Sequence, residues 1–258
     1  MTLRGKRALV TGAGGGIGRA TAIVFAQHGA QVGLCDIDDK AGEETAAMVT
    51  RDGGSATYVS ADVSDPVAVD RFVSHAVERF GGVDILVNNA GIGGSGARLA
   101  DISDSEWHRI FSVNVDGHFY CCRRVLPHLI RAGGGAIVNT SSVLAVSTLP
   151  GTLTYATSKA ALIGFTKELA HELGPFGIRV NCLLPGSTDT AMMWRDVKPA
   201  ERAVVEAEVA SAQPLKRVAR PDEIAHAALF LASDDASFIT GAALPVDGGL
   251  LSRIATTR

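Results

Sequence analysis

The sequence predicts an α/β fold, in which one doubly wound parallel sheet of about seven strands is covered by helices on both faces. Two features of the chain lead to this prediction. Short apolar runs alternate with helical patterns almost from end to end, as in parallel α/β sheets. These runs are continuously apolar, which is typical of strands buried on both faces. No repeat or polar linker divides the 258 residues, so we expect a single domain over 1–258.

Each expected strand is a short apolar run that ends at glycine, aspartate or another turn residue. In chain order the strands are 7–12, 31–36, 56–62, 84–91, 136–142, 178–186 and 243–249. Helical patterns lie between them; Gly29 closes the first and Pro66 stands in the first turn of the third, as helix ends prefer. These helices are expected at about 17–28, 38–52, 64–81, 105–132, 153–173 and 220–233. Residues 187–220 are less regular, apart from a helical pattern at 200–210.

Composition and charge exclude several classes of protein. Lysine and arginine total 24 against 27 acidic residues, a net charge of −3, and no long basic run suggests a nucleic-acid partner. No stretch approaches about 18 apolar residues and residues 1–11 lack a secretory segment, so we expect no membrane span and a cytoplasmic protein. The cysteines show no CxxC pair or metal-ligand spacing. We therefore expect no metal site and four buried, reduced thiols: Cys35, Cys121, Cys122 and Cys182.

A glycine-rich turn joins the first strand to the first helix and reads "TGAGGGIG" over 11–18. Gly12, Gly16 and Gly18 allow a tight turn, a close approach of the backbone to a pyrophosphate, and packing of the helix on the strand. The helix N-terminus then offers unpaired N–H groups to the phosphates. The spacing is G-x-x-x-G-x-G rather than G-x-G-x-x-G. This unit predicts a Rossmann-type dinucleotide site.

Asp36, at the end of the second strand, favours NAD over NADP. A carboxylate there can accept hydrogen bonds from the adenosine ribose and would repel a 2′-phosphate. The alternative is a helix cap, which Asp38 would supply equally well. The two positions where a basic residue would favour NADP hold Gly15 and Ile37. Arg19, as a helix residue, is expected to face outward.

Tyr155 and Lys159 lie four residues apart in an expected helix, so their side chains are neighbours. Most such pairs are surface contacts, and the pair alone does not indicate catalysis. Together with other motifs, however, the chain resembles the short-chain dehydrogenase/reductase family over nearly all its length. The motifs that carry the resemblance are, in order, "TGAGGGIG" (11–18), Asp62–Val63, "NNAG" (88–91), Asn114, Ser142, "YATSK" (155–159), "PGSTDT" (185–190) and "GAALPVDGG" (241–249).

The resemblance implies four catalytic residues. Tyr155 would be the general acid/base, and Lys159, together with the oxidised nicotinamide, would lower its pKa from about 10. Ser142 would hold the substrate oxygen. The alternative is that Ser142 is only a turn serine at the end of a strand, as the neighbouring Ser141 can be. Asn114 would bind a water that relays protons from Lys159; it can equally be a residue that kinks its helix.

The resemblance also implies the cofactor contacts. Asp62 would accept a hydrogen bond from the adenine amino group, Thr188 would bind the nicotinamide carboxamide and Thr190 would lie near the phosphates. The full set is Gly12, Gly15, Gly16, Ile17, Gly18, Asp36, Ile37, Asp62, Val63, Asn89, Ala90, Gly91, Tyr155, Lys159, Pro185, Gly186, Thr188 and Thr190.

In this family the segment after the "PG" turn caps the substrate, which here corresponds to 187–215. The candidate substrate contacts are apolar: Leu144, Leu149, Met192, Met193 and Trp194. Such a pocket suits a hydrophobic or alicyclic secondary alcohol or ketone better than a sugar. The alternative is that these residues close a lid or form a subunit contact.

The leading hypothesis is therefore an NAD-dependent oxidoreductase that converts a secondary alcohol to a ketone and back. A 3-oxoacyl-thioester (acyl carrier protein) reductase is the nearest alternative, but it commonly prefers NADP, against which Gly15 and Asp36 argue. A non-catalytic dinucleotide sensor would usually have lost the tyrosine or the lysine. The C-terminal segment from 241 onward and the helix of Cys121 and Cys122 resemble family interfaces and imply a homotetramer.

Overall fold

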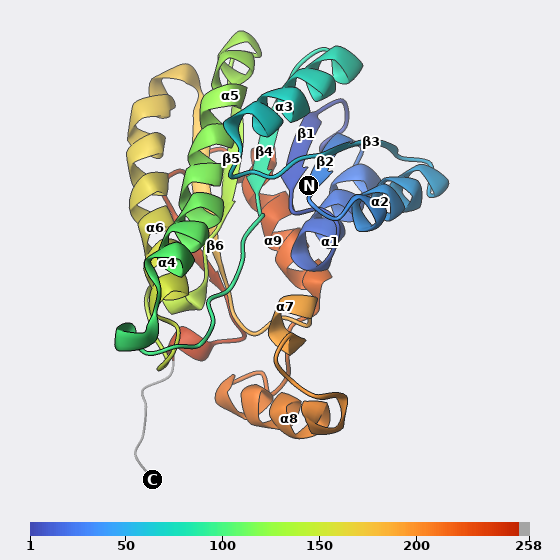
Figure 1. Ribbon diagram of the computed structural model, residues 1–258. Coiled ribbons are helices and arrows are strands. Elements are labelled where there is room, and N and C mark those ends of the chain that lie inside the picture. The colour runs from blue at the N-terminus through green and yellow to red at the C-terminus, as the bar shows by residue number, and fades with distance from the viewer. Residues whose placement is uncertain (253–258) are drawn as a thin grey trace.

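The computed structural model describes residues 1–252 and contains one seven-stranded parallel sheet between two layers of helices (Figure 1). The strand order is β3-β2-β1-β4-β5-β6-β7, and every neighbouring pair is parallel. The predicted doubly wound α/β fold is confirmed. The strands are β1 Arg7–Thr11, β2 Gln31–Asp36, β3 Ser55–Ser60, β4 Ile85–Asn88, β5 Gly135–Thr140, β6 Ile178–Pro185 and β7 Ala243–Val246.

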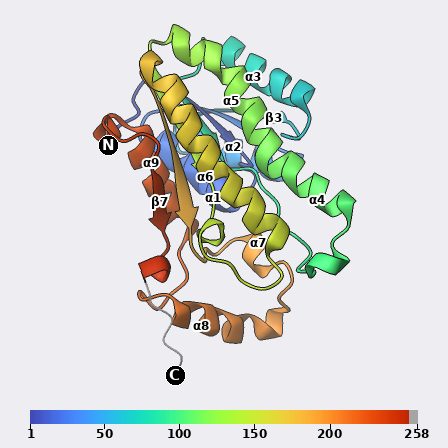
Figure 2. The same ribbon diagram turned by 90° about the vertical axis from the view of Figure 1, so that its left-hand side faces the viewer.

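The helices form one layer on each face of the sheet (Figures 1 and 2). Helices α1, α2 and α9 contribute to the core on one face, and α3, α5 and α6 to the core on the other. The helices are α1 Gly16–Gln27, α2 Asp39–Arg51, α3 Pro66–Phe80, α4 Asp104–Phe111, α5 Gly117–Arg131, α6 Leu153–Leu173, α7 Ala191–Trp194, α8 Arg202–Ala212 and α9 Pro221–Ala232.

Successive residues of the central strands supply the two cores alternately. Leu9 of β1 packs with α3 and α5, while its neighbours Ala8 and Val10 pack with α1 and α9. In β4, Leu86 and Val87 divide in the same way. This follows from the two-residue period of a strand, which requires apolar residues at every position when both faces are covered.

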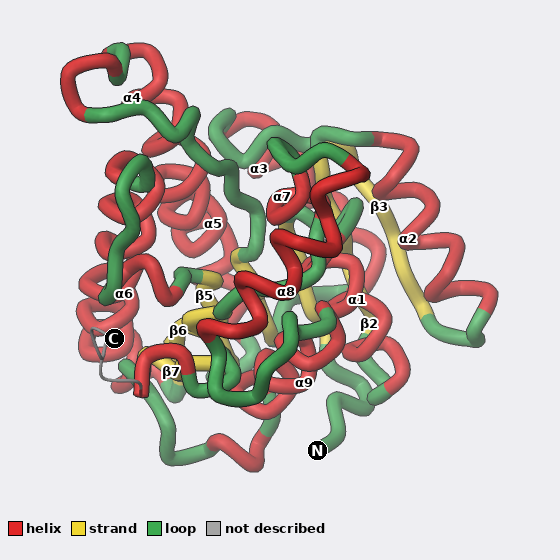
Figure 3. Tube along the Cα trace, turned by 90° about the horizontal axis from the view of Figure 1, so that it is seen from below, coloured by secondary structure: helices red, strands yellow, loops and turns green. Residues whose placement is uncertain are grey.

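The topology places the site at one edge of the sheet. Strand β1 pairs with both β2 and β4, so the direction of winding reverses between β1 and β4. Beyond the carboxyl ends at such a point, the diverging loops leave a crevice. The view from below shows α7 and α8 lying across this end of the molecule (Figure 3).

One segment differs from the sequence prediction. The expected helix over 105–132 is interrupted by a π-helical turn, Ser112–Asp116, between α4 and α5. Its centre is Asn114, whose side chain bonds the backbone of a distant loop. The irregular region 187–220 contains α7, a 3₁₀ turn at Pro199–Glu201 and α8.

The four cysteines are buried free thiols, as expected. In the described part of the chain, no helix combines the length and apolar character that crossing a bilayer requires. Within residues 1–252, no group of three or more His, Cys, Asp or Glu side chains is arranged to hold a metal ion.

Candidate active site

A cavity of about 1010 Å³ opens at the carboxyl ends of the strands and gathers most of the predicted site residues. It extends from Asp36, the last residue of β2, and Asp62, which follows β3, to Met192 and Met193 in α7. The loops after β1, β4, β5 and β6 supply the walls between these ends. Three predicted residues do not line the cavity: Gly18, Asn114 and Trp194. Each has another place in the structure.

The glycine turn forms one wall and is open to an anion. Gly12 and Gly16 have φ values of 64° and 50°, in the left-handed region where glycine is favoured. Helix α1 begins at Gly16, and its N-cap, Gly15, supplies no capping side chain. The first N–H groups of α1 are therefore available to a phosphate. This arrangement fits a dinucleotide.

Gly18 has a packing role beneath this wall. A β-carbon at Gly18 would overlap the Gly12 carbonyl and lie 2.5 Å from Asn89 Nδ2. The same amide nitrogen donates to the carbonyls of Thr11 and Gly12, each at 3.1 Å. The absence of a side chain at Gly18 thus lets α1 approach the turn and the loop after β4.

Asp36 lines the cavity and is held by the backbone around it. Its Oδ2 accepts from Gly14 N–H at 2.8 Å and its Oδ1 from Asp38 N–H at 3.0 Å. The cap of α2 is Asp38, which accepts from Ala41 N–H at 3.0 Å. Asp36 is therefore not needed as the helix cap.

The expectation that Arg19 faces outward is wrong. Its guanidinium turns back over the first turn of α1 and donates to the Gly14 and Ala41 carbonyls and, at 3.0 Å, to Thr45 Oγ1. A long side chain can cover the turn before its own Cα, which its position on the helix alone does not reveal. Arg19 thus fixes the glycine turn to α2.

Asn114 joins the π turn to the loop after β4. Its Oδ1 accepts from Ile92 N–H at 2.8 Å, and its Nδ2 donates to Ile92 O and to Ser158 Oγ, both at 3.0 Å. Asn114 is fully buried. Its side chain thus completes hydrogen bonds that the irregular helix and loop would otherwise leave open.

Tyr155 and Lys159 lie side by side on α6, and they are not a surface pair. Lys159 is only 3% exposed; its Nζ donates to Thr140 O at 2.8 Å and lies 5.7 Å from the centre of the Tyr155 ring. Burial lowers the pKa of the Lys159 ammonium to about 8. Both side chains line the cavity.

The protein's own groups raise the pKa of Tyr155, whereas a catalytic base at neutral pH needs a lowered pKa. Burial raises the pKa of the phenol, and hydrogen bonding to Ser142 acts in the opposite direction. The Lys159 charge does not overcome this effect by itself, because desolvation disfavours a phenolate. A positive charge bound beside the phenol would act in the opposite direction and lower the pKa of Tyr155.

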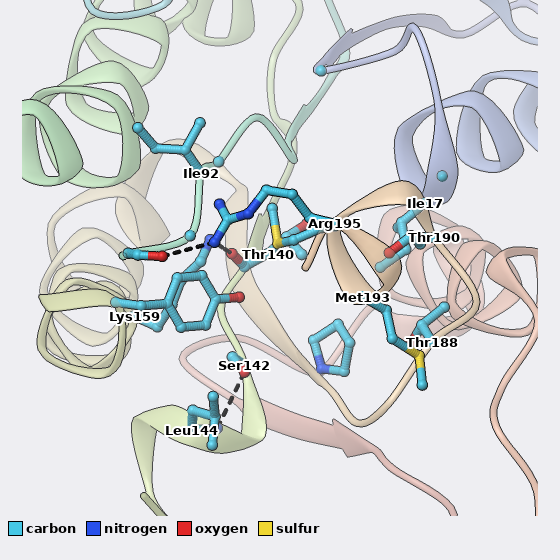
Figure 4. A pocket seen from close by; sticks show the side chains of 18 of the residues that line it. Ile17, Ile92, Thr140, Ser142, Leu144, Lys159, Thr188, Thr190, Met193 and Arg195 are labelled. Atoms are coloured by element: carbon cyan, nitrogen blue, oxygen red, sulfur yellow. Dashed lines mark hydrogen bonds between the residues drawn. The ribbon is translucent and has the colours of Figure 1, made fainter. Parts of the chain in front are cut away.

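The two adjacent serines after β5 have different environments. Ser141 Oγ donates to the Lys159 carbonyl at 2.7 Å, which fixes β5 to α6. Ser142 Oγ accepts from Leu144 N–H at 3.1 Å and lines the cavity (Figure 4). Of the two, Ser142 is the one placed to contact a ligand.

The far end of the cavity is mainly apolar. Leu144, Leu149, Met192 and Met193 line it, as expected. Trp194 lies outside it: the indole Nε1 donates to Asp189 Oδ1 at 2.6 Å, and the Arg202 guanidinium stacks 5.6 Å from the ring centre. Trp194 therefore anchors α7 to neighbouring residues.

Two arginines at this end were not predicted as site residues. Arg195, directly after α7, and Arg109, on α4, both line the cavity. Arg195 extends across the cavity, and its Nη2 donates to Gly94 O at 2.7 Å (Figure 4). In the sequence, Arg195 follows the apolar "AMMW" run and has no pattern that separates it from a surface arginine.

Comparison with known proteins assigns the family. The family model described as enoyl-(acyl carrier protein) reductase matches residues 12–251. The chain belongs to the short-chain dehydrogenase/reductase family. It is an oxidoreductase that acts on CH–OH groups with a nicotinamide dinucleotide, as the sequence predicted.

Three relatives illustrate the range of short-chain dehydrogenases that this chain is similar to. It is 40% identical to 2,5-dichloro-2,5-cyclohexadiene-1,4-diol dehydrogenase of Sphingobium indicum, over 96% of this chain and 97% of the relative. It is 39% identical to 3-oxoacyl-[acyl-carrier-protein] reductase of Chlamydia muridarum, over 95% and 97%. Among solved structures, levodione reductase has a TM-score of 0.94 and 33% identity, over 98% of this chain and 100% of the other.

Proposed function

We propose that this short-chain dehydrogenase transfers hydride between NAD(H) and a hydrophobic or alicyclic secondary alcohol or its ketone. The observation that carries the proposal is the placement of Tyr155 and Lys159 side by side in one cavity with Ser142. A hydroxyl proton and a hydride must leave adjacent atoms of the substrate. A phenol next to a buried cation can accept the hydroxyl proton. A dinucleotide bound in the same cavity can accept the hydride.

Each polar group has a separate task in this proposal. Tyr155 takes the hydroxyl proton during oxidation and returns it during reduction. Ser142 donates a hydrogen bond to the substrate oxygen as charge develops there. Lys159 adds positive charge beside the phenol and binds the nicotinamide ribose, while Asn114 orders the loop at Ile92 and holds the water of a proton relay. Bound NAD(H) supplies the hydride acceptor or donor and, when oxidised, positive charge near Tyr155.

The preference for NAD rests on Asp36. Its carboxylate lines the cavity beside Ile37, where it would bind the ribose hydroxyls and repel a 2′-phosphate. Arg19 is engaged with the Gly14 carbonyl and Thr45, so its guanidinium is not directed to a phosphate. The adenine would lie against Val63 with Asp62 at its amino group, and Thr188 and Thr190 would contact the carboxamide and phosphates.

The substrate class rests on the cavity lining. Leu144, Leu149 and Met193 present apolar surface beyond Ser142, and we assign 187–215 as the capping segment. The relative from Sphingobium acts, by its name, on a ring diol, which supports an alicyclic substrate here. A 3-oxoacyl-thioester reductase is the second candidate, because the relative from Chlamydia bears that name.

We also propose a cytoplasmic homotetramer. The four free thiols favour a reducing compartment. Part of the segment behind the tetramer prediction, 253–258, lies outside the described residues. A monomeric mass by light scattering at micromolar concentration would refute the tetramer.

The test is turnover at 340 nm with NAD and NADP, a panel of cyclic alcohols, sugars and a 3-oxoacyl thioester, and the variant Tyr155→Phe. We expect NAD-dependent oxidation of cyclic alcohols, and a loss of about 10²–10⁴-fold in kcat for Tyr155→Phe with NADH binding retained. Tyr120→Phe, on α5 outside the cavity, is the matched control.

Other outcomes would contradict specific parts of the proposal. Full activity in Tyr155→Phe would exclude the assigned acid/base. A clear preference for sugars would overturn the substrate class, and a preference for the thioester with NADPH would favour the second candidate. Tight NADH binding with no turnover of any alcohol or ketone would instead indicate a sensor.

A further inference from the structure

The charged side chains that line the cavity differ between its two ends. Asp36 ends β2 and Asp62 follows β3, at the end that fits the adenosine. The other end holds three cations and one carboxylate: Lys159, Arg109, Arg195 and Asp196. Of the cations, Lys159 is bound to the Thr140 carbonyl beside Tyr155. The two arginines have no part in the proposed chemistry, yet they stand at the substrate end.

Arg195 is held in place by a neutral group and keeps hydrogen-bonding capacity. Its Nη2 donates to the Gly94 carbonyl at 2.7 Å, which positions the guanidinium without neutralising it. Nη1 donates no hydrogen bond within residues 1–252. It faces Gly93, where a β-carbon would stand only 3.3 Å from Nη1. The glycine therefore leaves room for a ligand atom beside this nitrogen.

Asp196, the acidic residue that pairs with Arg195, is a weak competitor. Asp196 Oδ2 accepts from Nε at 3.1 Å and from Nη2 at 3.0 Å. However, the Asp196 side chain is 80% exposed and that of Arg195 is 48% exposed, so water screens this ion pair. Asp196 therefore occupies the Nε/Nη2 edge of the guanidinium but holds it only weakly.

Arg109 adds a second cation from a different element. It lies on α4, lines the same cavity and forms no ion pair within the described chain. Its charge helps to lower the pKa of Glu106 on the preceding turn, but Glu106 is already bonded to Ser95 N–H at 3.0 Å. Arginines on two elements thus face one apolar space.

We propose that the substrate is an alicyclic alcohol or ketone that carries a carboxylate, and that Arg195, assisted by Arg109, binds this carboxylate. A planar guanidinium matches a carboxylate geometrically, and the partly apolar wall strengthens the attraction. Leu144, Leu149 and Met193 would cover the ring between the two polar ends. The inference rests on the proposed function, since it assumes that the reacting hydroxyl lies at Ser142 and Tyr155.

The test compares a hydroxycyclohexanecarboxylate with its carboxamide, which has the same shape and no charge. We expect wild-type enzyme to prefer the acid, and Arg195→Gln to lower kcat/KM for the acid by about 10- to 100-fold while changing the amide less than threefold. Arg195→Lys would recover only part of the loss. Lys198→Gln, in the same segment but exposed and outside the cavity, is the matched control and should change neither substrate.

Asp196→Asn provides a test in the opposite direction. Removing the competing carboxylate should raise kcat/KM for the acid and leave the amide unchanged. A fall for the acid would contradict the assignment. Equal loss for acid and amide in Arg195→Gln, or a parallel loss of NADH affinity, would also overturn it, because the guanidinium would then serve the fold or the cofactor.

The inference and the proposed function fail in different ways. Turnover of neutral cyclic alcohols without preference for the acid would overturn the inference and leave the proposed function intact. If no alcohol reacts, binding of cyclohexanecarboxylate to the protein–NADH complex, followed by NADH fluorescence, still tests Arg195. Weaker binding in Arg195→Gln than in Lys198→Gln would support the carboxylate site, and equal or absent binding would refute it.

Discussion

At the residue scale, the site combines groups that its motifs identify with groups that only the fold reveals. Tyr155, Lys159 and Ser142 were predictable because their order along the chain matches a family pattern. The cavity position of Arg195 was not, since an arginine in an irregular segment has no periodicity to interpret. Arg19 was mispredicted because helix position fixes the direction of Cβ but not the path of a long side chain.

Lys159 makes stability depend on pH in a definite direction. Its pKa falls from 10.5 to about 8 on folding, so between these values the unfolded chain binds more protons and stability rises with pH. The free energy of unfolding of wild type relative to Lys159→Met should therefore increase by about 2–3 kcal/mol from pH 8 to 10.5. Urea unfolding of both ligand-free proteins at several pH values measures this; a difference that stays constant would contradict it.

At the element scale, strand positions were predictable because burial on both faces requires continuous apolar runs. Asn114 was predictable as a residue that can kink its helix, but the apolar pattern of 105–132 continues across this point and does not show a π turn. Its cause is the side chain of Asn114, which bonds Ile92, 22 residues earlier in the chain. Contacts between segments so far apart leave no local pattern. The sequence therefore locates such a residue without revealing the shape of its helix.

The glycine turn offers a matched pair of substitutions. A methyl group at Gly18 would overlap the Gly12 carbonyl, whereas Gly15 has an extended backbone, φ −163°, and open space around its β position. Gly18→Ala should lower the free energy of unfolding by about 3 kcal/mol. Gly15→Ala should leave it unchanged or raise it by less than about 1 kcal/mol. Urea unfolding without cofactor compares them, and similar stabilities would refute the packing role.

At the scale of the whole molecule, four thiols are buried, and three of them, Cys35, Cys121 and Cys122, lie in the core on the face that α3, α5 and α6 cover. Cys35, Cys121, Cys122 and Cys182 come from strands and a helix that were predictable as apolar segments. The sequence also indicated that the thiols are reduced, since no spacing suited a disulfide or metal. What it did not indicate is how strongly their burial affects titration.

The buried thiols should make the fold sensitive to alkali. Burial raises the pKa of all four, to about 12 for Cys122 and about 11 for Cys182. Above about pH 9 the unfolded chain loses thiol protons that the folded protein retains, so stability falls with rising pH by up to about 1.4 kcal/mol per unit for each thiol. Replacing Cys122 with alanine should make this slope less negative by up to about 1.4 kcal/mol per pH unit. An unchanged slope in urea unfolding between pH 9 and 10.5 would contradict the assignment.

The helix that lies across the cavity end, α8, contributes no buried residue, and neither does α7. Amino-acid changes there remove little from the packed interior, and most surface substitutions alter stability only slightly. Lineages can therefore explore this segment by drift while the sheet and the reacting groups stay intact. In this architecture, changes in α7 and α8 can alter which substrate is accepted without lowering the stability of the fold.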